Sequence, residues 1–444
     1  MSDPLLTAWE KTVRRRANER AITEAAGGRS VTFRELDIGA NAWVSRHVSD
    51  GTPLARRAVV AAIPNGIAWI ETFLGLLKSR AIIVPLDAAE PPAAQHRLAE
   101  LLHAAFLWDG TKLVSLPSAA RATRVASCLV KLTSGTTGTP RAIHFTGDQL
   151  LADARQITST MGITARDLNY ALIPFGHSYG LGNLTIPLLT HGVPVVCGTS
   201  ALPHAIAADF ARWKPTVFPG VPAMWRALAA SDLTLKSLRL GISAGAPLRP
   251  ETAREFAARF GVRLHNFYGS SETGGIAYDR SGRATLNGGV GRAMRGVTLE
   301  SLRNSRLEVT SAAVFTQRNP RRQKGLGAWV MADAVTRNST GELTLQGRRG
   351  QTIKIAGRRV SLAEVAQRLL AIAGVHEAWV GTTTGSEPVL SAVVATTLTV
   401  PALRTALHAD TAAWKIPKKW VVIPALPLTA RGKTDTRALQ ALIG

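Results

Sequence analysis

Cysteine is scarce in this sequence, and long apolar runs are missing. Cys128 and Cys197 are the two thiols among 444 residues, which excludes a disulfide framework and favours a reducing, cytoplasmic compartment. Even residues 63–77 are interrupted by a proline, an asparagine and a glutamate, so no segment reaches the roughly 18 apolar residues that suggest a membrane span. No apolar segment follows the arginines at 14–16, and we expect neither a secretory signal nor a membrane-spanning helix.

Acidic residues are also few. The chain has 30 Asp and Glu against 53 Lys and Arg, which gives a formal net charge of +23. This balance attracts polyanions such as nucleotides, anionic lipid, nucleic acid or an acidic acyl-carrier protein. Residues 318–359 carry ten basic and two acidic side chains, and a solvated basic face is the alternative for this cluster. Because no nucleic-acid reading motif is recognisable, we expect no nucleic-acid partner.

Apolar residues are plentiful, at 46% of the chain, and at this length they predict more than one core. The order strand, helix, strand at 58–63, 66–78 and 81–84 is typical of a parallel βαβ unit. Further apolar segments at 169–173, 193–197, 216–218 and 238–242 alternate with helical stretches at 203–213 and 250–260. This alternation predicts an α/β architecture.

The second half of the chain changes pattern twice. Between 282 and 347 short alternating segments replace the helical period and predict a β-rich subdomain. After about residue 350, Ser361 and Glu364 form a capping box, and strands and helices follow it. We therefore predict a large N-terminal domain of mixed α/β sheets with a small β-rich subdomain over residues 1–349, and a small α+β domain over 350–444.

A loop rich in hydroxyls and glycines is the strongest chemical signal. The apolar segment Leu129–Leu132 ends in Thr133-Ser-Gly-Thr-Thr-Gly-Thr-Pro140, through which no helix continues. Glycines let the backbone approach a phosphate, while N–H and hydroxyl groups donate to its oxygens. The loop is no Walker A motif, because neither Lys nor Ser/Thr follows its second glycine in the required register. Thr146 and Gln149 then predict a capped helix.

This loop, with Arg141 after it, resembles the signature loop of the adenylate-forming superfamily, which includes acyl-CoA synthetases, aryl-acid ligases and adenylation domains. Further segments resemble that family's motifs and occur in the same order: Leu77–Ala81 with Pro85–Asp87, Pro174–Gly180, Phe267–Thr273, Gly347–Arg359 and Pro427–Asp435. The resemblance spans the chain nearly end to end. It implies an AMP-binding domain with a mobile C-terminal lid domain. It also implies an ATP-dependent ligase that forms an acyl-AMP, releases pyrophosphate and passes the acyl group to a thiol.

The resemblance assigns individual residues to the phosphates of ATP, to Mg²⁺ and to the charge that develops during the reaction. The loop positions expected to grip the phosphates of ATP are Thr133, Ser134, Gly135, Thr136, Thr137 and Gly138. Glu272 matches the glutamate that helps to hold Mg²⁺, a hard cation that prefers oxygen ligands, and Ser271 keeps the hydroxyl of the family's threonine. Lys433 matches the lysine that bridges the acid's carboxylate and the phosphate as charge develops. An exposed tail lysine is the alternative for Lys433.

The nucleoside contacts follow in the same way. The matching positions are Ala244, Gly245, Ala246, Tyr268, Gly269, Asp333 and Arg348. Tyr268 would stack on adenine, with an ordinary core aromatic as the alternative. Asp333 would accept hydrogen bonds from the ribose hydroxyls, with a solvated surface acid as the alternative.

The resemblance also implies two arrangements of the small domain, one for adenylation and one for thiol transfer. At the expected hinge this sequence has Gly350, where relatives have an acidic residue or a lysine. Glycine has the widest backbone freedom, so rotation stays possible but is less restricted to two states. Gly357 and Arg359 match residues that approach the thiol channel and the phosphate in the second arrangement. Arg359 could equally belong to the basic face.

The acid substrate is the least determined part. His177 would flank the acyl pocket, with a hydrogen-bonded core histidine as the alternative. Segment 175–180 contains no acid to pair with an α-ammonium group, which favours a non-amino carboxylic acid, fatty or aryl. Plausible pocket-lining positions are Val221, Pro222, Gly269, Gly274 and Gly275.

Two hypotheses of other classes stay open at this point. Arg141 replaces the family's lysine and changes the geometry of the charge, and together with Gly350 it motivates a catalytically weak nucleotide- or acyl-binding homologue with a regulatory or assembly role. The net charge motivates a polyanion-binding protein. The favoured hypothesis requires ATP, Mg²⁺ and either coenzyme A or a phosphopantetheine carrier, whose acidic surface would suit the basic chain.

Overall fold

The computed structural model describes residues 3–48, 54–90, 92–117, 127–133, 141–302, 306–315, 326–348, 352–355, 358–383, 389–409, 411, 415–429 and 434–444. The chain divides into two compact units. The first comprises Met1–Glu300, Glu308–Trp329 and Asn338–Leu343, and the second comprises Ser301–Leu307, Val330–Arg337 and Thr344–Gly444. The predicted boundary between residues 349 and 350 lies outside the described residues and stays a prediction.

The larger sheet of the first unit runs in the order β15-β14-β13-β12-β11-β9-β10-β1-β2. Its strands in chain order are β1 (Arg20–Glu24), β2 (Ser30–Thr32), β9 (Asn169–Ala171), β10 (Val195–Cys197), β11 (Val217–Gly220), β12 (Leu240–Ser243), β13 (Leu264–Ser270), β14 (Gly274–Tyr278) and β15 (Arg292–Ala293). The neighbours from β1 through β10, β9, β11 and β12 to β13 all pair in parallel. β14 then turns back antiparallel on β13.

The second sheet has the order β6-β5-β3-β4-β7-β8. Its strands are β3 (Ala58–Ala62), β4 (Ile82–Leu86), β5 (Phe106–Trp108), β6 (Leu113–Ser115), β7 (Leu129–Thr133) and β8 (Arg141–Phe145). β3, β4 and β7 are parallel neighbours, while β7 and β8 form an antiparallel pair. β3, the helix α3 (Ile67–Lys78) and β4 form the βαβ unit predicted from the sequence.

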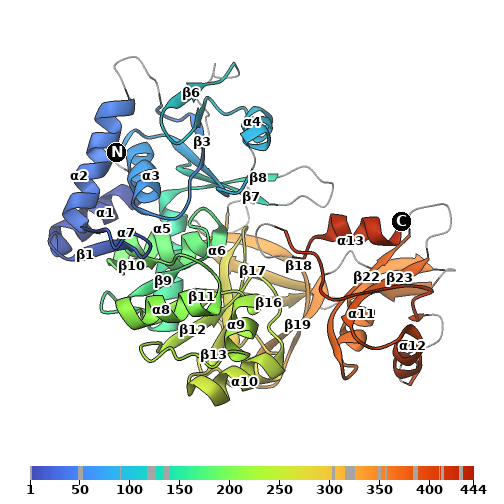
Figure 1. The fold of residues 1–444 in the computed structure, drawn as a ribbon. Coiled ribbons are helices and arrows are strands. Elements are labelled where there is room, and N and C mark those ends of the chain that lie inside the picture. The colour runs from blue at the N-terminus through green and yellow to red at the C-terminus, as the bar shows by residue number, and fades with distance from the viewer. Residues whose placement is uncertain are drawn as a thin grey trace. The chain divides into compact units, whose positions relative to one another are not determined.

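Helices lie against the sheets of the first unit (Figure 1). The helices, besides α3, are α1 (Pro4–Arg16), α2 (Phe33–His47), α4 (Pro92–Leu101), α5 (Gly147–Met161), α6 (Ser178–Gly180), α7 (Ile186–His191), α8 (Pro203–Trp213), α9 (Pro222–Ala229) and α10 (Pro250–Phe260). A π-helix spans Leu181–Thr185 and a 3₁₀ turn spans Thr285–Asn287. Helix α5 begins at the predicted capping box, because Thr146 Oγ1 accepts from Gln149 N while Gln149 Oε1 accepts from Thr146 N.

Buried clusters hold this unit together, and two of them carry its large aromatic side chains. In the first, Trp225 of α9 and Phe256 of α10 pack with Phe218 of β11 against one face of the larger sheet. In the second, Trp9 of α1 and Trp43 of α2 belong to a core that also takes residues of both sheets. Fully burying one such aromatic contributes roughly 1.5–3 kcal/mol relative to leaving it exposed, so these helices fix the sheets that carry the site.

The remaining strands form smaller sheets. A four-stranded sheet has the order β16 (Thr298–Leu302), β17 (Arg306–Ser311), β18 (Gly327–Arg337), β19 (Leu343–Arg348), as expected for the β-rich subdomain. The second unit also contains β20 (Thr352–Ile355), β21 (Arg358–Ser361), α11 (Leu362–Leu370), β22 (Val375–Thr382), β23 (Leu390–Thr396), α12 (Val400–His408), β24 (Lys419–Ile423) and α13 (Thr436–Ile443). Its sheet has the order β22-β23-β24. The predicted α/β fold class is therefore confirmed.

Membrane-spanning helices are absent from the described part of the chain, since none of its helices is both long and apolar enough to cross a bilayer.

Candidate active site

The carboxyl ends of the parallel strands in the larger sheet bring several predicted residues to one edge. After β9 the chain leads to His177, after β11 to Val221, and after β12 to Ala244. Since β9, β11, β12 and β13 are consecutive parallel neighbours, these segments leave the sheet on the same side. Ligands of open α/β sheets bind outside such carboxyl ends.

The second sheet presents its own carboxyl edge to the same place. Asn65, which follows β3, donates from Nδ2 to Ile173 O at 2.8 Å and accepts from Phe175 N at 2.7 Å. Asp87, which follows β4, has Oδ2 3.4 Å from His177 Nε2. Two parallel sheets thus meet at their carboxyl ends, and the candidate site lies where they meet.

His177 and Asp87 form a further polar contact between the two edges. The Asp87 side chain is 10% exposed and its Oδ1 accepts from Ala89 N at 3.0 Å. Nε2 of His177 is buried and has no hydrogen-bond partner of good geometry among the described residues. Asp87 was not predicted as a site residue, although it is the first acid after a buried parallel strand.

The glycine-rich loop leaves β7 and returns to β8. Thr133, the last residue of β7, pairs across the hairpin with Arg141, the first residue of β8. The predicted phosphate-binding positions between them lie outside the described residues: Ser134, Gly135, Thr136, Thr137 and Gly138. Their role stays a prediction, but both ends of the loop are placed at the carboxyl edge of the second sheet.

Arg141 stacks on two aromatic rings. Its guanidinium carbon lies 5.6 Å from the Phe315 ring centroid and 5.2 Å from that of Trp329. The two rings pack on each other at 5.0 Å, and Phe315 N donates to Glu272 O at 3.0 Å. A planar guanidinium stacks on aromatic faces better than an ammonium does. The sequence predicted that arginine in place of lysine changes the geometry of the charge here. In the structure Arg141 stacks on Phe315 and Trp329, and Phe315 links the end of the loop to the Glu272 turn.

Glu272 lies half-buried at the turn between β13 and β14, among hydroxyl groups. Its N–H donates to Ser270 Oγ at 3.2 Å, and Ser270 Oγ lies 3.1 Å from Thr273 Oγ1. The adjacent Ser271 accepts at Oγ from Ser178 Oγ at 2.9 Å, which fixes this turn to the residue after His177. The described residues form no cluster of three or more His, Cys, Asp or Glu side chains. One carboxylate at a turn suits Mg²⁺, whose other ligands are commonly phosphate and water oxygens.

A buried cation and a buried acid lie behind this turn, and the sequence analysis missed both. Asp153 of α5 accepts from Gly275 N at 2.9 Å, and Lys131 of β7 lies with Nζ 4.3 Å above the Phe145 ring centroid. Burial lowers the pKa of Lys131, and the negative charges of Asp153 and Glu272 oppose that shift. Burial raises the pKa of Asp153, against the effect of Lys131. The available signal was a lysine inside the otherwise apolar segment Leu129–Leu132.

The predicted adenine-binding positions lie at the same edge. Tyr268 of β13 is 7% exposed, and a bulge separates it from the exposed Gly269. Ala244 is buried, whereas Gly245 and Ala246 are exposed. Next to them, Ser243 Oγ is buried without a hydrogen-bond partner among the described residues. A buried hydroxyl that lacks a partner is costly, and a ligand at this edge would offer one.

The other predicted site residues belong to the second unit or lie outside the described residues. Asp333 is a half-buried residue of β18, and Arg348 and Arg359 are backbone members of β19 and β21. Gly357 and Lys433 lie outside the described residues, although Leu428 and Thr434 on either side of Lys433 pair antiparallel. The roles assigned to these five residues stay predictions.

Sequence and fold comparisons find AMP-binding enzymes and CoA ligases similar to this chain. Residues 118–309 match the family model described as AMP-binding enzyme. The chain is 27% identical to benzoate–CoA ligase of Thauera aromatica over 71% of this chain and 66% of that protein. It is also 27% identical to 2-hydroxy-7-methoxy-5-methyl-1-naphthoate–CoA ligase of Streptomyces carzinostaticus, over 93% of this chain and 74% of the relative. Its fold resembles that of ATP-bound MatB from Rhodopseudomonas palustris, with a TM-score of 0.85, 22% identity, and coverage of 100% and 99% of the two chains.

Proposed function

We propose that the chain, whose residues 118–309 match the AMP-binding enzyme model and which is similar to CoA ligases, activates a carboxylic acid with ATP and transfers the acyl group to a thiol. The acid would attack the α-phosphorus of ATP, so that an acyl-AMP forms and pyrophosphate leaves. The thiol of coenzyme A or of an acyl-carrier protein would then displace AMP. One observation carries this proposal. The carboxyl ends of the parallel strands of both sheets meet at one place, and the hydroxyl-rich loop and the Glu272 turn begin there.

The residues at this edge would hold and neutralise the negative charges of ATP and of the acid substrate. The hydroxyl and N–H groups of 133–138 would hold the phosphates, and Glu272 would hold Mg²⁺, which neutralises phosphate charge when bound. Tyr268 would hold the adenine, and Asp333 and Arg348 the ribose region. Lys433, brought from the second unit, would stabilise the charge that builds between the carboxylate and the phosphate. Gly357 and Arg359 would serve the thiol-transfer arrangement.

We propose a substrate acid without an α-amino group, fatty or aryl, with aryl acids as the first to test. The names of the benzoate and naphthoate ligases support the aryl class. The structure adds one fact that the segment 175–180 did not reveal, because Asp87 places a carboxylate beside His177. That carboxylate already lies against His177 and accepts from Ala89 N, so a substrate ammonium would have to displace these protein contacts.

The adenylation step is tested by acid-dependent exchange of labelled pyrophosphate into ATP. With a panel of aryl, fatty and amino acids, we expect exchange with a non-amino acid. Lys433→Ala should lower the exchange rate by at least about 100-fold, since losing one preorganised contact to developing charge has effects of that order. Lys418→Ala removes an exposed lysine of the same unit and should leave the rate unchanged. Intact exchange in Lys433→Ala would refute its assignment.

The thiol-transfer step needs a separate measurement. Stoichiometric release of AMP with coenzyme A alone, or with a pantetheinylated carrier protein alone, identifies the acceptor. If no acid on the panel supports exchange while ATP still binds, the ligase proposal fails, and a nucleotide-binding homologue without catalysis is the remaining hypothesis.

A further inference from the structure

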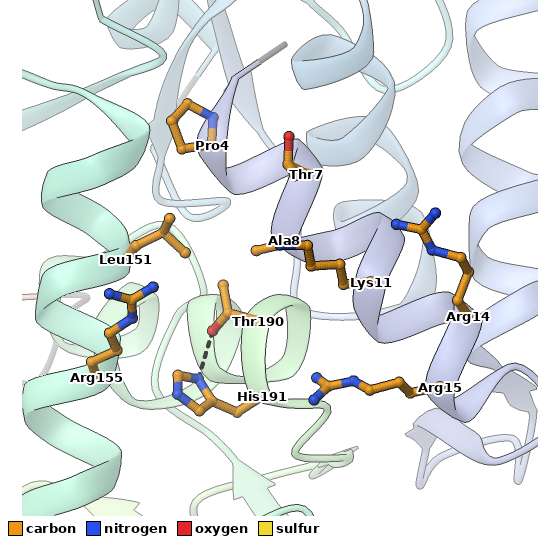
Figure 2. A pocket seen from close by; sticks show the side chains of 10 residues that line it. All are labelled: Pro4, Thr7, Ala8, Lys11, Arg14, Arg15, Leu151, Arg155, Thr190 and His191. Carbon is orange, nitrogen blue, oxygen red and sulfur yellow. Dashed lines mark hydrogen bonds between the residues drawn. The ribbon is translucent and has the colours of Figure 1, made fainter.

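A basic pocket with a volume of about 620 Å³ lies between α1, α5 and α7 of the first unit (Figure 2). Its lining residues are Pro4, Thr7, Ala8, Lys11, Arg14, Arg15, Leu151, Arg155, Thr190 and His191. None of them belongs to the loop at 133–140, to the Glu272 turn or to any predicted substrate position. The volume falls within the range of small-molecule sites.

The cations of this pocket have no ion-pair partner among the described residues. Lys11, Arg14, Arg15 and Arg155 are exposed, and no described carboxylate pairs with any of them. The neighbouring Arg16 behaves differently, because it pairs with Glu19 and donates to the carbonyls of Ala165 and Gly192. Arg16 therefore holds this end of α1 to the neighbouring loops, and the other cations make no such contact among the described residues. The other cations repel one another, and a bound anion would relieve that repulsion.

The lining of the pocket also offers apolar surface and a hydroxyl group. Pro4, Ala8 and Leu151 supply apolar surface, and Thr190 supplies a hydroxyl that holds His191. Thr190 Oγ1 donates to Ile186 O at 2.7 Å and lies 2.7 Å from His191 Nδ1. Nδ1 therefore carries the proton and donates to Thr190.

His191 also reports on the charges around it. In Figure 2, Arg155 of α5 and Arg15 of α1 approach the imidazole from opposite sides. Burial lowers the pKa of His191, and the charges of Arg155 and Arg15 lower it further. At neutral pH the imidazole is uncharged, so the positive charge of the pocket comes from its lysine and arginines.

We propose that this pocket binds a small phosphorylated molecule, with its phosphates on Lys11, Arg15 and Arg155 and its apolar part on Pro4, Ala8 and Leu151. A single carboxylate would leave most of the positive charge uncompensated, whereas a polyphosphate carries several charges and suits the fork of an arginine. The site is separate from the candidate active site, although both use α5. Asp153 faces the Glu272 turn, and Arg155, two positions later, lies about 200° further around the helix.

The test uses inorganic tripolyphosphate as the probe and the whole chain. Nuclear magnetic resonance of His191, assigned through His191→Gln, reports binding at this pocket separately from binding at the active site. We expect a saturable shift of the His191 signal and a rise in its pKa when the anion binds. In the double variant Arg15→Gln/Arg155→Gln, which removes two charge-assisted contacts, the dissociation constant should rise by about tenfold or more.

The control is Arg97→Gln/Arg283→Gln, which lowers the net charge equally at two exposed arginines outside the pocket. It should change the dissociation constant by less than about twofold. Equal weakening in both double variants would reduce the effect to net charge and overturn the proposal. It is also overturned if tripolyphosphate gives no saturable shift, or if only vesicles of phosphatidic acid or polyglutamate bind. Unchanged pyrophosphate exchange in Arg15→Gln/Arg155→Gln would show that the variant is folded.

Discussion

Arg141 illustrates how a single residue ties two parts of the candidate site together. The residue follows the loop predicted to bind phosphate, and its guanidinium stacks on Phe315 and Trp329. Phe315 in turn donates its N–H to the carbonyl of Glu272. Arginine at this position therefore keeps the positive charge of the family's lysine and adds a packing contact that a lysine side chain provides less well.

We predict that Arg141→Lys raises the KM for ATP in the exchange reaction roughly twofold to fivefold, because a stacking contact of about 0.5–1 kcal/mol at the loop is lost. Arg212→Lys is the matched control. Arg212 also lies over a ring, 4.6 Å from the Trp213 centroid, but away from the loop, so its KM should be unchanged. An unchanged KM in Arg141→Lys would mean that charge alone matters at this position.

At the scale of elements, the β13–β14 turn and helix α5 depend on each other. Gly274 has a φ of +69°, and a side chain there would overlap Asp153 Oδ1. Asp153 cannot move away freely, because it is buried and accepts from the N–H of Gly275. The turn that presents Glu272 thus requires glycine for two reasons, backbone conformation and space.

Two glycine substitutions separate these reasons. Gly261, at the end of α10, has a φ of +68° with nothing near its Cα in the direction of a side chain, so Gly261→Ala should lower the free energy of unfolding by about 1–2 kcal/mol through backbone strain alone. Gly274→Ala should cost at least about 1 kcal/mol more, because Asp153 must give way. Urea unfolding followed by circular dichroism measures both. Equal losses would show that Asp153 yields without cost.

At the scale of the whole molecule, the chain divides into two compact units, and the proposed reaction would use residues of both. The candidate nucleotide edge is built within the first, while Lys433 and Arg359 belong to the second. The resemblance assigns the hinge between them to Gly350, which lies outside the described residues. A hinge of wide backbone freedom would let one chain serve both half-reactions.

We predict that Gly350→Pro slows thiol transfer at least about tenfold while pyrophosphate exchange changes less than about threefold, because a fixed φ restricts the swing between arrangements. Rapid-quench measurement of AMP release from preformed acyl-AMP follows transfer, and isotope exchange follows adenylation. Gly350→Ala, which keeps most backbone freedom, should leave both nearly unchanged. A proline variant that slows both steps equally would place the hinge elsewhere.

Much of this protein could be predicted from its sequence, because the relevant signals are local. The helical stretches predicted at 203–213 and 250–260 match α8 and α10 to the residue, and the capping box at Thr146 marked the start of α5. The resemblance to the superfamily, predicted from the order of the motifs, agrees with the match of residues 118–309 to the AMP-binding enzyme model and with the similarity to CoA ligases. Helices α1 and α2 were not predicted, although Asp3 with Pro4 and the capping box of Thr32 with Glu35 are local signals of the same kind.

The tertiary structure decided which segments far apart in the chain come into contact. The pairing of His177 with Asp87, the stacking of Arg141 on Phe315 and Trp329, and the approach of Arg15 and Arg155 to His191 depend on how sheets and helices pack. A motif records which chemistry a segment carries, because hydrogen bonding and backbone freedom are properties of neighbouring residues. The burial that shifts a pKa, and the neighbour that completes a site, come from distant residues and exist once the chain has folded.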